Sequence, residues 1–168
     1  LESGALAGMK GLRKLTIPAL SGEADYLAYY FGAKSAVDNG SAGIYSPVSL
    51  AEVTIVKSPT ALADYAFYGF GALRTIRGLD DLQSIGKYAF AHTAIADVNI
   101  PTRLTGIGEN AFFGCTNISS FVVSADNAAY TAFDHCLYNK QLTVLYMVPQ
   151  AKTEVAFPDT LTTIAAGA

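Results

Sequence analysis

The chain contains little of what enzyme and metal sites are usually made from. Its 168 residues include two histidines and two cysteines, Cys115 and Cys136, and charged residues make up only 15% of the total. A zinc site would need paired cysteine or histidine ligands, and a small disulfide-stapled domain would need more cysteines. We therefore expect both cysteines to be buried thiols, with a disulfide between them as the alternative.

Long hydrophobic runs and clustered positive charge are also missing. No window approaches the roughly 18 uninterrupted apolar residues of a transmembrane helix, and the formal net charge is −3. Nucleic-acid binding needs a clustered basic surface, so we expect no nucleic-acid partner. The sequence has no phosphate loop, no G-x-S-x-G motif and no metal-binding helix. We expect neither an enzyme nor a bound cofactor or metal.

A base stands next to a thiol at one place, in the run Asp134-His135-Cys136. An activated cysteine needs a base within hydrogen-bond reach of its sulfur. Neighbouring residues of a strand point to opposite faces, so His135 cannot activate Cys136 locally. This run therefore does not change the expectation of a protein without catalytic residues.

What the chain does have is a repeat of apolar residues, which account for 51% of its composition. The dipeptide Ala-Phe begins at Ala66, Ala89 and Ala111, at spacings of 23 and 22 residues. An aliphatic residue precedes each alanine by four positions, and further apolar residues follow in fixed register. Such a repeat predicts a solenoid, in which stacked units bury a face that no single unit could bury alone.

Each unit combines two kinds of segment. Stretches such as "LRKLTI" and "VNIP" alternate apolar and polar residues, which predicts a short strand with one face buried. Stretches such as "TGIGENAFFGCT" place their apolar residues at three-to-four spacing, which predicts a short helical return. We expect the phenylalanine of each Ala-Phe pair to form one layer of a continuous core, and the small alanine to let the coil pass close.

Several of these units resemble the BspA-like leucine-rich repeat family of bacterial surface proteins. Family units have the approximate pattern I-G-x-x-A-F-x-x-C-x-x-L-x-x-I-x-I-P, and "NIPTRLTGIGENAFFGC" follows it almost residue for residue; "SIGKYAF" and "LTTIAAGA" match in part. The unit "YAFAHTAIADV" departs from the pattern because it is one residue short, with His92 and Thr93 in place of Gly-Cys. Phe70 replaces the cysteine in "YAFYGF".

The resemblance implies an α/β solenoid: a right-handed coil of 22–23-residue units, with short parallel strands on one face and irregular or short helical returns. It also implies two insertions, at 19–46 and at 124–149. In the second, "LYNKQLTVLYMV" is predicted to form two strands about a tight Asn-Lys turn. We expect one domain over 1–168, cut from a longer protein, because repeat positions recur at both ends of the chain.

Side chains that alternate away from the predicted core form the candidate binding face. They are Lys14, Thr16, Glu52, Thr54, Thr75, Arg77, Asp97, Asn99 and Ser120. A ladder of this kind is the usual binding surface of a solenoid, and a plain solvated face is the alternative. Tyr26, Tyr29 and Tyr30 are a second candidate, because tyrosine rings either contact a partner or pack an insertion onto the coil.

The resemblance further implies a function. Members of the family are expected on the cell surface or outside the cell, so we expect a protein-binding or adhesion module without catalysis. The expected partner is a host matrix or mucosal protein, a protein of another bacterium, or a glycan. The alternatives are a stalk that presents another domain, and a carbohydrate-binding module of a gut commensal. The latter would need exposed, coplanar aromatic rings.

Overall fold

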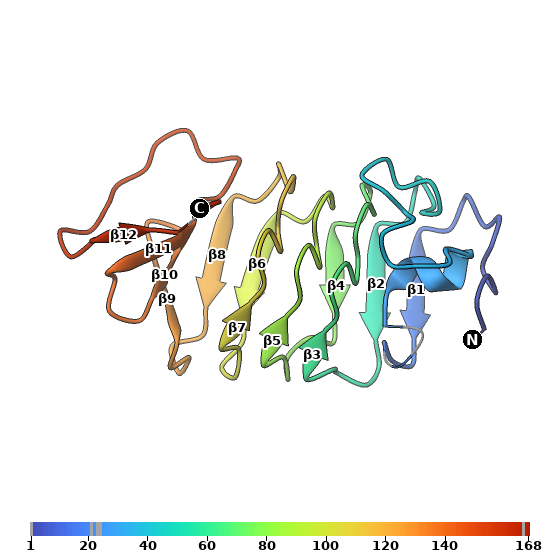
Figure 1. The fold of residues 1–168 in the computed structure, drawn as a ribbon, viewed down its shortest axis with the longest axis horizontal. Helices are drawn as coiled ribbons and strands as arrows, with labels where there is room; N and C mark the ends of the chain where they lie inside the picture. Colours follow the sequence, from blue (N-terminus) through green and yellow to red (C-terminus); the bar gives the residue numbers. More distant parts are fainter. Residues whose placement is uncertain (1, 21, 23–24, 166) are drawn as a thin grey trace.

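The computed structural model describes residues 2–20, 22, 25–165 and 167–168, which form a solenoid (Figure 1). The strands of one face are β1 (Lys14–Ile17), β2 (Glu52–Ile55), β4 (Thr75–Arg77), β6 (Asp97–Ile100) and β8 (Ser120–Val123). A second face carries the shorter strands β3 (Ala61–Leu62), β5 (Ser84–Ile85) and β7 (Gly106–Ile107). Successive turns of the coil pass from a long strand to a short strand and return through an Ala-Phe segment.

Parallel pairing keeps equivalent repeat positions in line. Strands β1, β2 and β4 form one sheet, β6 and β8 a second, and β3, β5 and β7 a third. Val53 lies opposite Ile76 and Val98 lies opposite Phe121, as the repeat alignment predicts. The alternation is also confirmed, because β2 and β6 each bury two residues and turn the other two outward.

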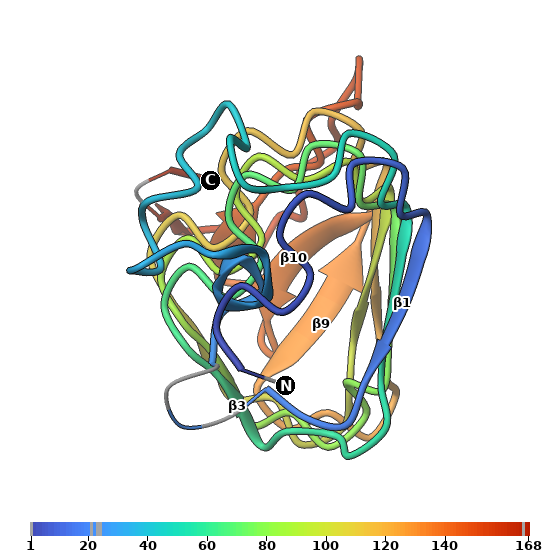
Figure 2. The same ribbon diagram turned by 90° about the vertical axis from the view of Figure 1, so that its right-hand side faces the viewer.

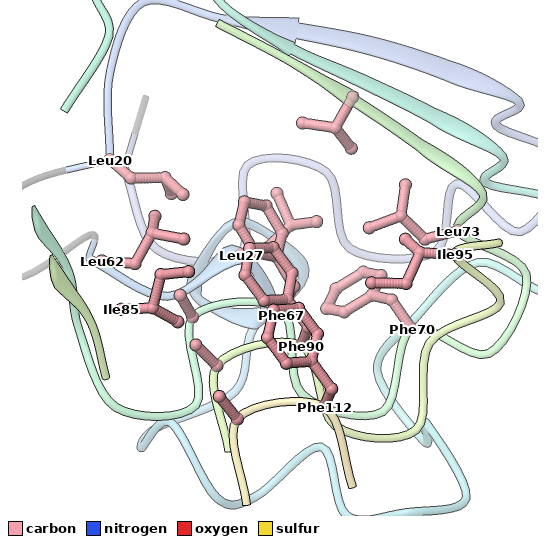
Figure 3. Close-up of a cluster of buried hydrophobic side chains, with 14 of the residues drawn as sticks. Leu20, Leu27, Leu62, Phe67, Phe70, Leu73, Ile85, Phe90, Ile95 and Phe112 are labelled. Carbon is pink, nitrogen blue, oxygen red and sulfur yellow. The ribbon is translucent and has the colours of Figure 1, made fainter. Parts of the chain in front are cut away.

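The phenylalanines of the Ala-Phe pairs form the predicted layers of the core (Figure 3). The Phe67 and Phe90 rings stack with centroids 5.4 Å apart and an interplanar angle of 7°, and Phe90 and Phe112 stack at 5.2 Å and 6°. The backbones of these segments are joined as well: Phe67 N–H donates to the Ala89 carbonyl at 2.7 Å. The alanines are fully buried, so close passage of the coil explains why a small residue precedes each ring.

The predicted helical returns are not found. The only helix among the described residues is the 3-10 helix η1 (Leu27–Phe31), and the returns are turns. Tyr88 and His92, which flank one Ala-Phe segment, have φ angles of +53° and +57°. A right-handed helix cannot pass through a left-handed residue. The α/β detail of the prediction is therefore not confirmed, and the solenoid consists of strands and turns.

The glycine that follows the isoleucine in two of the units allows adjacent turns to approach each other. A Cβ atom at Gly86 would lie 2.5 Å from the Ala63 carbonyl carbon and 2.5 Å from the Asp64 nitrogen. A Cβ at Gly108 would lie 2.5 Å from the Lys87 nitrogen. The neighbouring atoms are backbone, which cannot move aside as a flexible side chain can.

We expect Gly86→Ala to lower the free energy of unfolding by about 1–3 kcal/mol, the usual cost of overpacking. Urea denaturation would measure the change. Gly11→Ala is the matched control, because a Cβ at Gly11 meets no heavy atom within 4 Å. Equal stability of Gly86→Ala and the parent chain would show that the turns are not in close contact there.

A fourth sheet follows the coil at the C-terminal end of the chain. Its strands are β9 (Tyr130–Phe133), β10 (Cys136–Asn139), β11 (Val144–Met147) and β12 (Thr163–Ile164), in the order β12-β11-β10-β9. Strands β10 and β11 are antiparallel, as predicted. The predicted Asn-Lys turn is wrong in length, because Asn139 ends β10 and the turn covers 140–143. The Asn139 Oδ1 stabilises the 140–143 turn by accepting hydrogen bonds from the Thr143 and Val144 N–H groups at 2.8 and 2.9 Å.

This sheet lies across the end of the coil (Figure 2), and β10 is buried on both faces. Leu137 packs into the main core with Tyr130. Cys136 and Tyr138 point the other way and form a small core with Leu145. The sheet therefore covers the apolar end of the solenoid with strands of the same chain.

The assignment of 19–46 and 124–149 as insertions stays a prediction. Residues 21 and 23–24 of the first range lie outside the described residues, and so does Leu1, on which part of the repeat alignment at the N-terminal end rests.

Candidate binding surface

The nine predicted residues of the candidate binding face point away from the core. Lys14, Thr16, Arg77, Asp97 and Asn99 are exposed, while Glu52, Thr54, Thr75 and Ser120 are partly exposed. The parallel register places Lys14 opposite Glu52 and Thr54 opposite Arg77. It also places Asp97 opposite Ser120. The structure therefore brings these residues together in rows within each sheet.

The charges of this face differ in how far they are neutralised. Lys14 Nζ lies 3.0 Å from Glu52 Oε2, an exposed ion pair of the kind that adds little stability. The Asp97 Oδ1 accepts a hydrogen bond from the Ser120 Oγ at 3.0 Å. Arg77 has no ion-pair partner in the described part of the chain. Its guanidinium group is free to pair with a carboxylate of another molecule.

The candidate binding face is divided by a cleft between β4 and β6. These two strands do not pair, although β4 pairs with β2 and β6 pairs with β8. The cleft has a volume of about 850 Å³, and Thr75, Arg77, Asp97 and Asn99 are among its lining residues. The break coincides with the short repeat unit, in which Ile76 and Val98 are 22 residues apart. The single ladder expected from the sequence is therefore two ladders with a cleft between them.

The second candidate, the tyrosines near η1, is corrected by the structure. Tyr26 and Tyr30 are buried, and Tyr29 is partly buried between them. The Tyr26 hydroxyl donates to the Ala33 carbonyl at 3.2 Å, and the Tyr30 hydroxyl donates to the Ala19 carbonyl at 3.1 Å. Burial raises the pKa of both hydroxyls.

These tyrosines also do not form a flat platform. Tyr29 meets Tyr26 and Tyr30 edge to face, at interplanar angles of 88° and 86°. The rings pack this segment onto the coil, which was the alternative interpretation. The coplanar, exposed aromatic surface that a carbohydrate-binding module would need is not present at these residues.

Sequence reasoning missed a partly exposed aromatic cluster on the returns. It consists of Tyr65, Tyr68, Tyr88, His92 and Phe113. The Tyr65 and Tyr88 rings stack at 5.3 Å and 5°. Phe113 forms T-shaped contacts with Tyr88 and with His92, at interplanar angles of 76° and 87°. Tyr65 and Tyr88 both directly precede the alanine of an Ala-Phe pair, so the repeat alignment contained the signal.

The two cysteines are free and buried. The Cys115 Sγ donates to the Phe90 carbonyl at 3.0 Å, inside the core. Burial raises the pKa of the Cys115 and Cys136 thiols, which lowers the thiolate fraction at neutral pH and makes both poor nucleophiles. His135 lies in the two-residue turn between β9 and β10, so the expectation that it neighbours Cys136 on a strand is wrong. There Asp134 and His135 have φ angles of +49° and +64°, the pattern of a type I′ turn.

Two further features bear on the kind of surface this is. Within the described ranges, no group of three His, Cys, Asp or Glu side chains gathers closely enough to bind a metal ion. Nowhere in the described residues is there a helix with the length and hydrophobicity needed to cross a membrane.

Comparison with known proteins gives a family match and three similar structures. The model of the BspA type leucine-rich repeat region matches residues 41–153 in six copies. A leucine-rich cell surface protein from Faecalibacterium prausnitzii is 25% identical, with a TM-score of 0.65 over 95% of this chain and 46% of that one. No curated protein sequence matches the chain.

The other two solved structures share the fold. The pneumococcal vaccine antigen PcpA is 22% identical, with a TM-score of 0.60 over 69% of this chain and 30% of that one. A leucine-rich repeat protein from Eubacterium ventriosum is 22% identical, with a TM-score of 0.59 over 90% of this chain and 49% of that one. The chain thus spans less than half the length of each of these proteins.

Proposed function

The chain belongs to the family of BspA type leucine-rich repeat proteins, and from this premise we propose that it is a non-enzymatic protein-binding module of a bacterial surface or secreted protein. The similarity to the Faecalibacterium prausnitzii cell surface protein supports the location. The proposed partners are proteins of a host matrix or mucosa, or surface proteins of other bacteria. A stalk that presents another domain is the alternative.

The observation that carries this proposal is the outward row of polar side chains on a rigid strand face. Arg77, Asp97 and Asn99 are exposed on strands whose other side is anchored in the core. A fixed backbone reduces the entropy lost on binding, so many weak contacts can add up to useful affinity. Arginine is also enriched among residues that dominate binding energy.

A binding screen tests the proposal. The chain would be tested by surface plasmon resonance against immobilised matrix proteins, mucins and glycans, beside a variant with Arg77→Ala, Asp97→Ala and Asn99→Ala. We expect saturable binding to a protein, weakened at least tenfold in the variant. The matched control replaces one cation, one anion and one amide elsewhere: Lys87→Ala, Asp126→Ala and Gln141→Ala, which are all exposed.

Each other outcome has a definite meaning. Binding that survives in the strand-face variant but is lost in the control variant would place the binding surface outside the candidate binding face. Binding to a glycan alone would replace the protein-binding function with carbohydrate binding. No binding across the whole panel would favour the stalk.

A further inference from the structure

We propose that the cleft between β4 and β6 binds an extended peptide segment of a partner protein, which pairs with both strand edges and places apolar side chains on the cleft floor. The proposal rests on the proposed protein-binding function and names the element of the partner that is recognised. It differs from a contact with the exposed side chains, because the main chain of the two strands supplies the hydrogen bonds.

The opening between the two strands is local. Just before the strands, the Ala94 N–H donates to the Leu73 carbonyl at 2.9 Å, so the two turns are joined there. On the second face β5 pairs with β7 in regular parallel register. The turns are joined again where the Thr105 N–H donates to the Gln83 carbonyl at 2.9 Å. Between these points β4 and β6 are unpaired, and Figure 1 shows them farther apart than β2 and β4 or β6 and β8. The cleft is therefore a gap in one sheet of an otherwise closed coil.

The strand edges that face the gap carry unpaired main-chain groups. The Ser124 N–H donates to the Ile100 carbonyl at 3.0 Å, so the main-chain groups of Ile100 face β8. Successive residues of a strand direct these groups to opposite edges, so those of Asn99 face the cleft. By the same rule the main-chain groups of Ile76 face the cleft, because the Thr75 N–H donates to the carbonyl of Ala51, the residue just before β2, at 3.1 Å. Such groups need a partner, which an added strand supplies.

The floor of the cleft is apolar and its rim is charged. Phe90 and Phe112 of the stacked core line it, together with Ile95. Arg77 and Asp97 stand on opposite strands at its rim, so the rim offers both signs of charge. Its volume of about 850 Å³ lies in the range of natural ligand sites. An apolar floor between two rows of main-chain groups suits a strand, whose side chains alternate between floor and solvent.

A defined peptide tests this binding mode. The probe copies residues 51–57, "AEVTIVK", with blocked termini, because Val53 and Ile55 of this segment already face the core next to β4. We expect saturable binding to the whole chain by fluorescence anisotropy. Methylation of alternate peptide nitrogens, which removes donors and keeps the side chains, should weaken binding at least tenfold. A peptide of the same composition in scrambled order should bind no better than the methylated one.

A pair of protein variants provides the second arm. Asn99→Pro removes the N–H group at the cleft edge while Val98 and Ile100 keep their pairing with β8, and proline is tolerated on edge strands. We expect at least tenfold weaker binding of the probe. Thr116→Pro is the control for the proline itself, because Thr116 is exposed in the turn that the Ile118 N–H closes on the Cys115 carbonyl and does not line the cleft, and it should bind within about twofold of the parent chain. If the thermal melt shows that Asn99→Pro does not fold, the comparison of methylated and unmethylated probe tests the proposal without this variant.

Failure of this proposal is distinct from failure of the proposed function. Absence of probe binding at saturating concentration, or equal binding of the methylated and unmethylated probes, would overturn the peptide-binding cleft. A partner from the binding screen that requires Arg77, Asp97 and Asn99 would still support the strand face in that case. If the probe binds but the screen finds no partner, the cleft is supported and the partner classes chosen for the screen are wrong.

Discussion

Replacing Phe90 with alanine is expected to lower the free energy of unfolding by about 3–5 kcal/mol, the usual cost of truncating a buried phenylalanine. Phe90 is the central ring of the stack and contacts Phe67 on one side and Phe112 on the other. Its removal leaves a cavity between two turns that neither ring can fill without moving its own backbone. A thermal melt should show a midpoint lower by about 10 °C.

Phe113→Ala is the matched control for this prediction. Phe113 is the same type of residue next to Phe112, but its side chain is 53% exposed and contacts only the edges of Tyr88 and His92 among the aromatic rings. We expect its replacement to cost less than about 1 kcal/mol. Equal melting temperatures for Phe90→Ala and Phe113→Ala would contradict the continuous stack.

Asn127→Ala has the second largest expected effect. Asn127 is buried, and its side-chain amide donates to the Pro101 and Leu104 carbonyls at 2.7 and 2.9 Å. Its oxygen accepts from the Ala129 and Tyr130 N–H groups at 2.8 and 2.7 Å. Alanine would remove this partner from all four backbone groups and leave three of them unpaired, because the Pro101 carbonyl also accepts from the Leu104 N–H at 3.2 Å. Because each buried unpaired group costs about 1–3 kcal/mol, we expect a loss of at least ~3 kcal/mol in urea denaturation.

The control for Asn127 is Asn117→Ala. Asn117 is exposed, and its amide reaches only the Ala94 carbonyl, at 3.5 Å. Its replacement should leave the denaturation midpoint nearly unchanged. A small effect of Asn127→Ala would mean that water replaces the lost amide, and that the junction between the coil and the C-terminal sheet of β9 to β12 is open to solvent.

The repeat alignment predicted the core because burial of these side chains depends on local spacing alone. Val53, Ile76, Val98 and Phe121 recur at nearly constant intervals, and parallel pairing places Val53 opposite Ile76 and Val98 opposite Phe121. The returns were harder, since an apolar spacing of three to four residues is common to a helix and to a tight turn. The left-handed residue before each alanine is Tyr65, Tyr88 or Asn110 rather than glycine, so the sequence contained no obvious helix breaker.

The candidate site was predicted only in part, for a different reason. The outward direction of Arg77 and Asn99 follows from alternation and is observed. The cleft does not follow, because the short unit keeps its inward apolar spacing and thus gives no sign that β4 and β6 separate. The role of Tyr26 and Tyr30 depends on the Ala33 and Ala19 carbonyls, which are brought close only by the folded chain. Composition alone could not show whether these two tyrosines pack the segment onto the coil or contact a partner.

The separation of β4 from β6 also has a mechanical consequence. Adjacent turns of a solenoid hold together through their shared interface, and here one interface lacks the hydrogen bonds of its longest strands. The β5–β7 pair and the stacked Phe90 and Phe112 rings still join the two turns on the other sides. We therefore expect a bending load on the coil to concentrate at this junction, which the β5–β7 pair still holds together.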